Sequence, residues 1–167
     1  TATLQAQGIG VTPLAPANCG FTLAWSSHFR DRFEGTPLKR IALRYGHANV
    51  RGEAVGTRHG IEGGAIYALS APLREALAAG QVAVLCIDLR PDLSEAALAK
   101  VLSAPRGKQS FSTFLRKAAG LPPVAIALLR EGMAADDPLS AWPADRVAGR
   151  IKAMPLPLIA PAPIARA

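Results

Sequence analysis

The sequence predicts an α+β protein with a β-barrel-like antiparallel lobe and a small helical-bundle lobe, and three observations support that class. The first half of the chain alternates apolar and polar residues with period two, as half-buried strands do. Residues 91–154 instead repeat their apolar positions with the spacing of amphipathic helices. A proline-flanked apolar segment at 156–159 must pair with the first half, because a strand has to satisfy its backbone polar groups.

The first half predicts strands separated by short helices and turns. Phe21, Leu23 and Trp25 share one side of an extended segment, and Gly80 ends an apolar helix. The run VAVLCIDL that follows is almost wholly apolar, which is typical of a buried strand. In chain order we expect an extended piece at 10–14, strands at 21–25, 38–45 and 50–55, a helix at 27–33, a turn at 46–49, a helix at about 64–79 and a strand at 82–89.

The second half predicts four helices and a return strand. Each helix has a start or stop signal, such as a serine cap, a proline pair or a following glycine. We expect helices from Asp92 and Glu95 (a capping-box pattern) through 102, from Ser110 to a stop at Gly120, from 124 to 131 before Gly132, and from 144 to 154. Leu98, Val101 and Leu102 are expected to face inward, as are Val147, Ile151 and Met154.

These elements suggest two lobes that share a core. We expect a β-rich lobe from residues 1–90 and 155–167 and a helical lobe from residues 91–154. Chain ends that meet on one lobe suit a domain inserted into a loop of another domain. The chain begins without Met and stops in an apolar, proline-rich stretch, so we expect it to be a piece of a longer polypeptide.

Composition bounds the possible partners. The chain has 167 residues, half of them hydrophobic, and a net charge of +7. The basic residues are dispersed along the sequence, which excludes a basic tail. Cys86 reads as a small core residue, whereas Cys19 lies in a loop where a reactive thiol is one interpretation. No apolar run reaches 18 residues and no secretory signal is present, so we expect a cytoplasmic location.

Known catalytic and metal motifs are missing from the sequence. The three histidines and two cysteines have no zinc-ligand spacing, so we expect no metal site. The sequence contains no G-x-G-x-x-G, no phosphate loop and no G-x-S-x-G elbow. Asp136 and Asp137 read as helix-capping loop residues and not as an acid/base pair. The chain alone therefore shows no catalytic constellation.

The stretch TRHGIEGGAIYALS, residues 57–70, is the best candidate for a functional site. Its glycines allow positive φ and a close approach to another molecule, and the helix start beyond them offers unpaired N–H groups. The alternative interpretation is a tight turn that needs glycine only for its own geometry. The candidate site residues are Thr57, Arg58, His59, Gly60, Gly63 and Gly64.

Several blocks, in order, resemble one known family. VTPLAPANCGF, RGEAVGTRHGIEGGAIYALS, IDLRPDLS and RGKQSFSTFLRKAAGLPPVAIALLRE look like the middle portion of bacterial NAD(P)/FAD-dependent oxidoreductases of the YhiN/BaiN-like flavoprotein family. The resemblance covers nearly the whole chain. It implies an inserted domain, with a split Rossmann-like FAD-binding domain flanking it in the same polypeptide.

The resemblance also implies a division of labour. FAD, with NAD(P)H as a possible reductant, would belong to the full-length protein and would carry out the hydride transfer. The insert would cover the cofactor cleft, help to shape the substrate pocket and be inactive by itself. Under this hypothesis the six candidate residues face the flavin or the substrate. Arg58 would form an ion pair with an anionic group, and His59 would transfer a proton.

Two other functions compete with this hypothesis. The helical hairpin at 108–131, with Lys108, Arg116 and Lys117, could bind nucleic-acid phosphates. Its apolar positions, however, are also those of an ordinary packed helix pair. A small barrel could instead carry one lipid or small ligand, although the sequence has few aromatic residues to line such a cavity.

Overall fold

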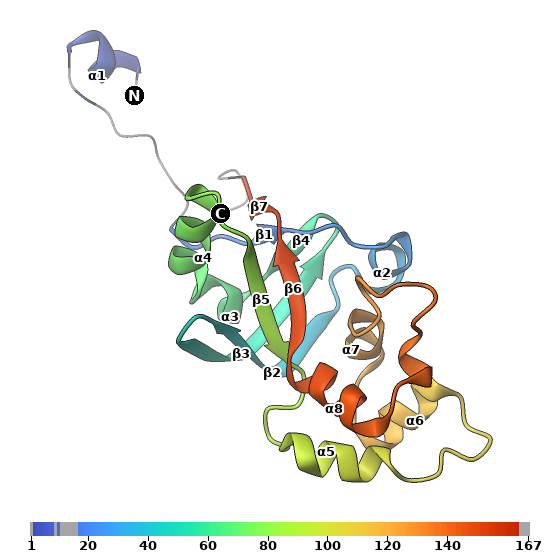
Figure 1. Ribbon diagram of the computed structural model, residues 1–167. Coiled ribbons are helices and arrows are strands. Elements are labelled where there is room, and N and C mark those ends of the chain that lie inside the picture. Colours follow the sequence, from blue (N-terminus) through green and yellow to red (C-terminus); the bar gives the residue numbers. More distant parts are fainter. Residues whose placement is uncertain (1, 9, 11–16, 164–167) are drawn as a thin grey trace.

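The computed structural model describes residues 2–8, 10 and 17–163 of the chain (Figure 1). Within these ranges the strands form one sheet in which every pairing is antiparallel. The strands are β1 (Phe21–Thr22), β2 (Pro37–Tyr45), β3 (Ala48–Thr57), β4 (Gly60–Glu62), β5 (Ala83–Asp88), β6 (Met154–Leu158) and β7 (Ala160–Pro161). The extended piece expected at 10–14 lies, apart from Gly10, outside the described residues.

Short helices precede the first strand and fill the connections between the later ones. They are α1 (Ala2–Ala6), α2 (Ser27–Phe33), α3 (Gly64–Tyr67), α4 (Ser70–Ala78), α5 (Glu95–Leu102), α6 (Phe111–Ala118), α7 (Pro123–Leu128) and α8 (Ala144–Lys152), with a 3₁₀ turn at Leu139–Ala141. Figure 1 shows α5, α6, α7 and α8 gathered beside the sheet, and α3 and α4 on its other side. The predicted α+β class, with an antiparallel barrel-like part and a small bundle of helices, is therefore confirmed.

The sheet closes on itself into a barrel. Its strand order is β6-β5-β2-β3-β4-β1-β7, so β6 and β7 form the two edges. These edge strands are consecutive in the chain, separated only by Ile159, whose N–H donates to the Thr22 carbonyl at 3.0 Å. One segment, Met154–Pro161, thus pairs with β5 at its start and with β1 at its end. The expectation that the last strand pairs with the first half is confirmed.

Prolines shape this segment, Met154–Pro161, which we call the closing segment. Met154, Leu156 and Leu158 are buried, whereas Pro155 and Pro157 are exposed. An antiparallel ladder uses the N–H groups of alternate residues, so the buried residues supply the donors to β5. The prolines then occupy the positions whose N–H would point away from β5, where the missing donor costs nothing.

The helix expected at 64–79 is instead two helices. α3 ends at Tyr67 and α4 begins at Ser70, with Ala68 and Leu69 in the turn between them. Pro72 has no N–H to donate to the Ala68 carbonyl, so a continuous helix would lose a bond there. The Ser70 hydroxyl bonds the main chain of Cys19 in both directions, at 3.1 Å each way, which fixes the break against the core.

Several sequence expectations about individual residues are wrong. Val84 and Val101 are about two-fifths exposed, so β5 buries only one face and α5 turns Val101 outward. The cap of α5 is Ser94, whose hydroxyl accepts from the Ala97 N–H, and Asp92 lies before the helix start and pairs with Arg51. Met154 begins β6 and does not end α8.

Asp137 also departs from expectation, because it caps no helix. Its carboxylate accepts from Trp142 Nε1 at 2.5 Å and pairs with Arg146 at 2.8 Å. The Trp142 hydrogen bond, and then Arg146, hold the pKa of Asp137 below its ordinary value against the opposing effect of desolvation. The Arg146 guanidinium lies 3.6 Å from the Trp142 ring centroid, so the three side chains form one cluster at the start of α8.

The buried helix α7 and the Lys152–Asp88 ion pair both join the barrel to the helices. α7 is buried from Val124 to Leu128, and it contacts β2, α2 and α6. Lys152 at the end of α8 pairs with Asp88 at the end of β5, with 2.6 Å between Nζ and Oδ2. The same ammonium also donates to the carbonyls of Arg90 and Leu93. This junction is well covered, since both charged side chains are less than one-fifth exposed.

Candidate functional site

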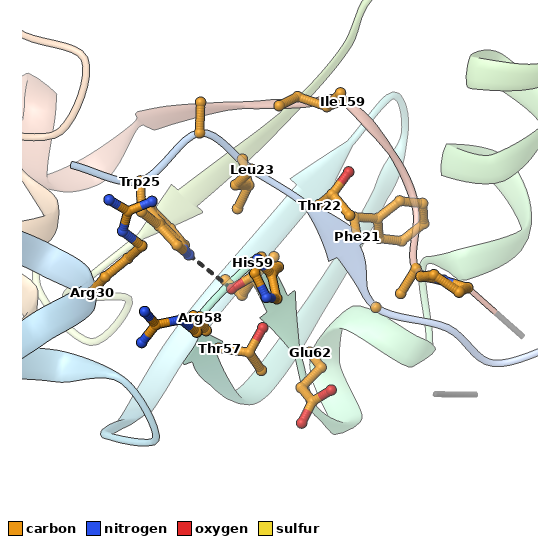
Figure 2. A pocket seen from close by; sticks show the side chains of 16 residues that line it. Phe21, Thr22, Leu23, Trp25, Arg30, Thr57, Arg58, His59, Glu62 and Ile159 are labelled. Carbon is orange, nitrogen blue, oxygen red and sulfur yellow. Dashed lines mark hydrogen bonds between the residues drawn. The ribbon is translucent and has the colours of Figure 1, made fainter. Parts of the chain in front are cut away.

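A groove of about 860 Å³ opens along the barrel between two segments of the chain. One wall is the segment 20–25, which contains β1. The other is the segment 57–62, which contains the β3–β4 turn and β4. We call this hollow the strap groove (Figure 2). Arg30 from α2 and Ile159 from the closing segment also line the groove. In Figure 2, Arg30 and Arg58 lie at the Trp25 end of the groove, and Ile159 lies on its other side.

The β3–β4 turn places Arg58 and His59 at the rim of the groove. Thr57 is the last residue of β3 and Gly60 is the first of β4. Arg58 and His59 between them therefore make a two-residue hairpin turn. The His59 carbonyl accepts from the Leu23 N–H at 2.9 Å. The turn backbone is thus held against the opposite wall, while the Arg58 and His59 side chains remain exposed.

Gly60 is required by the protein's own packing. A Cβ at this position would lie 1.8 Å from the Phe21 carbonyl oxygen, because β1 and β4 pair there in direct register. The Gly60 carbonyl in turn accepts from Trp25 Nε1 at 2.9 Å. The turn interpretation therefore explains this glycine without any ligand.

The two following glycines differ from each other. Gly63 has φ +119°, and a Cβ at this position would lie 3.1 Å from the Ala54 Cα, so any other residue would be strained there. Gly64, the first residue of α3, has nothing within 4 Å of such a Cβ. Neither residue is among the described residues that line the strap groove. The structure thus brings Thr57, Arg58, His59 and Gly60 together on the groove and leaves Gly63 and Gly64 outside it.

The charges of the strap groove are mixed, with cations at one end. Arg58 makes an exposed ion pair of 3.6 Å with Glu34, and Glu62 lies on the same hairpin. For Arg30 the structure shows no ion pair among the described residues. Beneath these groups Trp25 stacks on Phe29 at 4.4 Å between ring centroids, which gives this end a rigid aromatic floor.

Part of the groove was not predicted from the sequence. Trp25 and Leu23 were expected in a strand, and their alternation could have pointed to a shared wall. Arg30 and Ile159 carry no such signal, because only the barrel closure and the packing of α2 bring them to the groove. Cys19 is fully buried, which rules out the reactive-thiol interpretation.

The described ranges offer neither a metal site nor a membrane span. No cluster of three or more histidine, cysteine or acidic side chains is placed to hold a metal ion in the described part of the chain. None of the described helices is long and apolar enough to cross a membrane.

The fold and the groove define a class of protein: an α+β domain with a closed antiparallel barrel and appended helices. A family model described as "HI0933-like protein barrel and H2TH domain" matches residues 15–167. The chain therefore belongs to this family, the inserted domain of the YhiN/BaiN-like flavoproteins, and the family resemblance is confirmed. No curated protein matches the chain.

Proposed function

We propose that this domain covers the flavin of a larger NAD(P)/FAD-dependent oxidoreductase and forms part of its substrate pocket through the strap groove. The observation that carries the proposal is the groove itself, whose volume of about 860 Å³ lies in the range of small-molecule sites. Its wall and floor are rigid, because β4, β1 and the Trp25 side chain are bonded to one another.

The groove fits a covering role better than an independent FAD site. Among the described residues it has no glycine-rich loop leading into a long helix, which is how proteins usually hold a dinucleotide pyrophosphate. The carbonyls of His59 and Gly60 are already occupied by the opposite wall. Side chains at the rim are what this domain has to offer, and the chemistry of hydride transfer would be supplied by the flavin.

Each rim residue has a distinct proposed task. Arg58 and Arg30 would attract an anionic group of the substrate to the Trp25 end of the groove. His59, exposed at the turn, would exchange a proton with the bound molecule. A flanking FAD-binding domain of the same polypeptide would close the open side of the groove and exclude water.

The test uses the full-length flavoprotein with the variants Arg58→Gln and His59→Gln. His47→Gln is the matched control, because His47 lies in the β2–β3 turn at the opposite end of β3. We expect Arg58→Gln and His59→Gln each to lower kcat/KM of the NAD(P)H-dependent reaction by about tenfold. His47→Gln should leave kcat/KM unchanged. Thermal melting should be the same for all three, since these side chains are exposed.

Turnover and a flavin absorbance spectrum that are unchanged in both variants would remove Arg58 and His59 from the site.

The nucleic-acid alternative is not favoured by the family match. Two of the basic side chains near the helical hairpin also have partners within the domain, since Arg130 bonds Ser112 and Arg106 lies 6.0 Å from the Phe111 ring centroid.

A further inference from the structure

A second groove, of about 270 Å³, lies between α2, α6 and α7 and is strongly basic. Three arginines line it, one from α2, one from α6 and one just after α7. An imidazole and two hydroxyl groups accompany them. The polar residues are His28, Arg32, Ser112, Thr113, Arg116 and Arg130, and we call this the three-helix groove.

Helix geometry explains why these side chains converge. His28 and Arg32 are four residues apart on α2, so they share one face of that helix. Ser112 and Arg116 have the same spacing on α6. Arg30 lies between the first pair in sequence and lines the strap groove instead. α2 therefore separates two grooves and gives basic side chains to each.

The positive charge of the three-helix groove has no internal counter-charge. No carboxylate is among the described residues that line it, and none forms an ion pair with Arg32, Arg116 or Arg130 in the described part of the chain. Glu34, just beyond α2, is directed to Arg58 at the strap groove. Like charges that share a concave surface repel one another and attract anions from solution.

The floor and one wall of this groove are fixed in place. Ile126 and Ala127 of the buried helix α7 form the floor. Arg130 donates from Nη2 to the Ser112 hydroxyl at 2.8 Å, which links the end of α7 to α6. Within the described part of the chain the Ser112 hydroxyl accepts this bond and donates none. The groove thus combines positioned guanidinium groups with hydroxyl donors, a set that suits a tetrahedral oxyanion.

We propose that the three-helix groove binds a small phosphate-bearing molecule. A phosphate group matches the guanidinium fork geometry and can accept from several donors at once. The compact volume favours a small ligand over a nucleic-acid strand, because backbone binding needs cations spread along a track and not gathered between three helices. This site is independent of the function proposed for the strap groove.

Isothermal titration of the full-length protein with sodium pyrophosphate, at constant ionic strength, tests this proposal. The variants are Arg116→Gln and Arg32→Gln, and Lys117→Gln is the matched control. Lys117 is exposed on the same helix and loses the same charge, but it does not line the groove. We expect saturable binding that each arginine variant weakens by about tenfold and that the lysine variant leaves within about twofold.

Three results would overturn the proposal. One is no saturable binding of pyrophosphate or inorganic phosphate. Another is equal weakening by Arg116→Gln and Lys117→Gln, which would mean attraction to net charge alone. The third is tighter binding of a short DNA or RNA strand than of pyrophosphate in a competition experiment, because the groove would then serve nucleic acid. All three substitutions alter exposed side chains, so we expect the melting temperatures to be unchanged. That result would confirm that each variant is folded.

Discussion

Gly60 occupies a position where two strands pass too closely for any side chain. Its built Cβ would lie within 3 Å of three backbone atoms of Phe21 and Thr22, and backbone cannot move aside as a flexible side chain can. The sequence could show that residues 57–64 are rich in glycine. It could not show which glycine is needed for packing, because that depends on the β1–β4 register of residues some 40 positions apart.

Substitution of two glycines in this stretch separates packing from open space. Gly60→Ala should lower the free energy of unfolding by about 3 kcal/mol, because β1 and β4 must separate to admit the methyl group. Gly64→Ala should change it by no more than about 1 kcal/mol and in the stabilising direction, since the site is open and helical. Urea unfolding followed by circular dichroism measures both. Equal effects of the two substitutions would contradict the close approach of β1 and β4.

At the scale of elements, local signals predicted a helix boundary correctly where a single residue determines it. Ser110 caps α6 and Gly120 follows its end, as expected from the sequence. Errors arose where two nearby residues carry the same local signal. Asp92 and Ser94 are both good cap residues, but Ser94 is the cap of α5, and Asp92 lies before the helix start and pairs with Arg51.

The cap of α5 offers a direct check at this scale. Ser94→Ala should destabilise the protein by about 1 kcal/mol, because the Ala97 N–H loses its acceptor. Asp92→Ala should cost about 0.5 kcal/mol or less, because its pair with Arg51 is mostly exposed. Thermal or urea unfolding of the two variants compares them. A larger loss from Asp92→Ala would restore the capping-box interpretation.

At the scale of the whole molecule, the barrel follows from a single segment that serves both edges of the sheet. The sequence predicted that the last strand returns to the first half, but not that it pairs with both β5 and β1. That closure brings Ile159 to the strap groove. The division of the chain into lobes of residues 1–90 with 155–167 and 91–154 stays a prediction, and one hydrophobic cluster runs through both parts.

The strap groove was only partly predictable for the same reason. Thr57, Arg58, His59 and Gly60 are contiguous, and a local pattern singled them out. Arg30 and Trp25 reach the same groove from α2 and from the segment after β1, through pairings that no local pattern encodes. The basic side chains of the three-helix groove likewise come from three separate segments.

The central proposal is that the strap groove faces the flavin in the full-length protein. Hydrogen exchange, measured by mass spectrometry on the apoprotein and on the FAD-loaded protein, tests it most directly. We predict slower exchange on FAD binding in peptides spanning 20–26 and 57–62, and no change around His47, which lies about 30 Å away along β3. Unchanged exchange at 20–26 and 57–62, in a protein that has bound FAD stoichiometrically, would contradict the proposal.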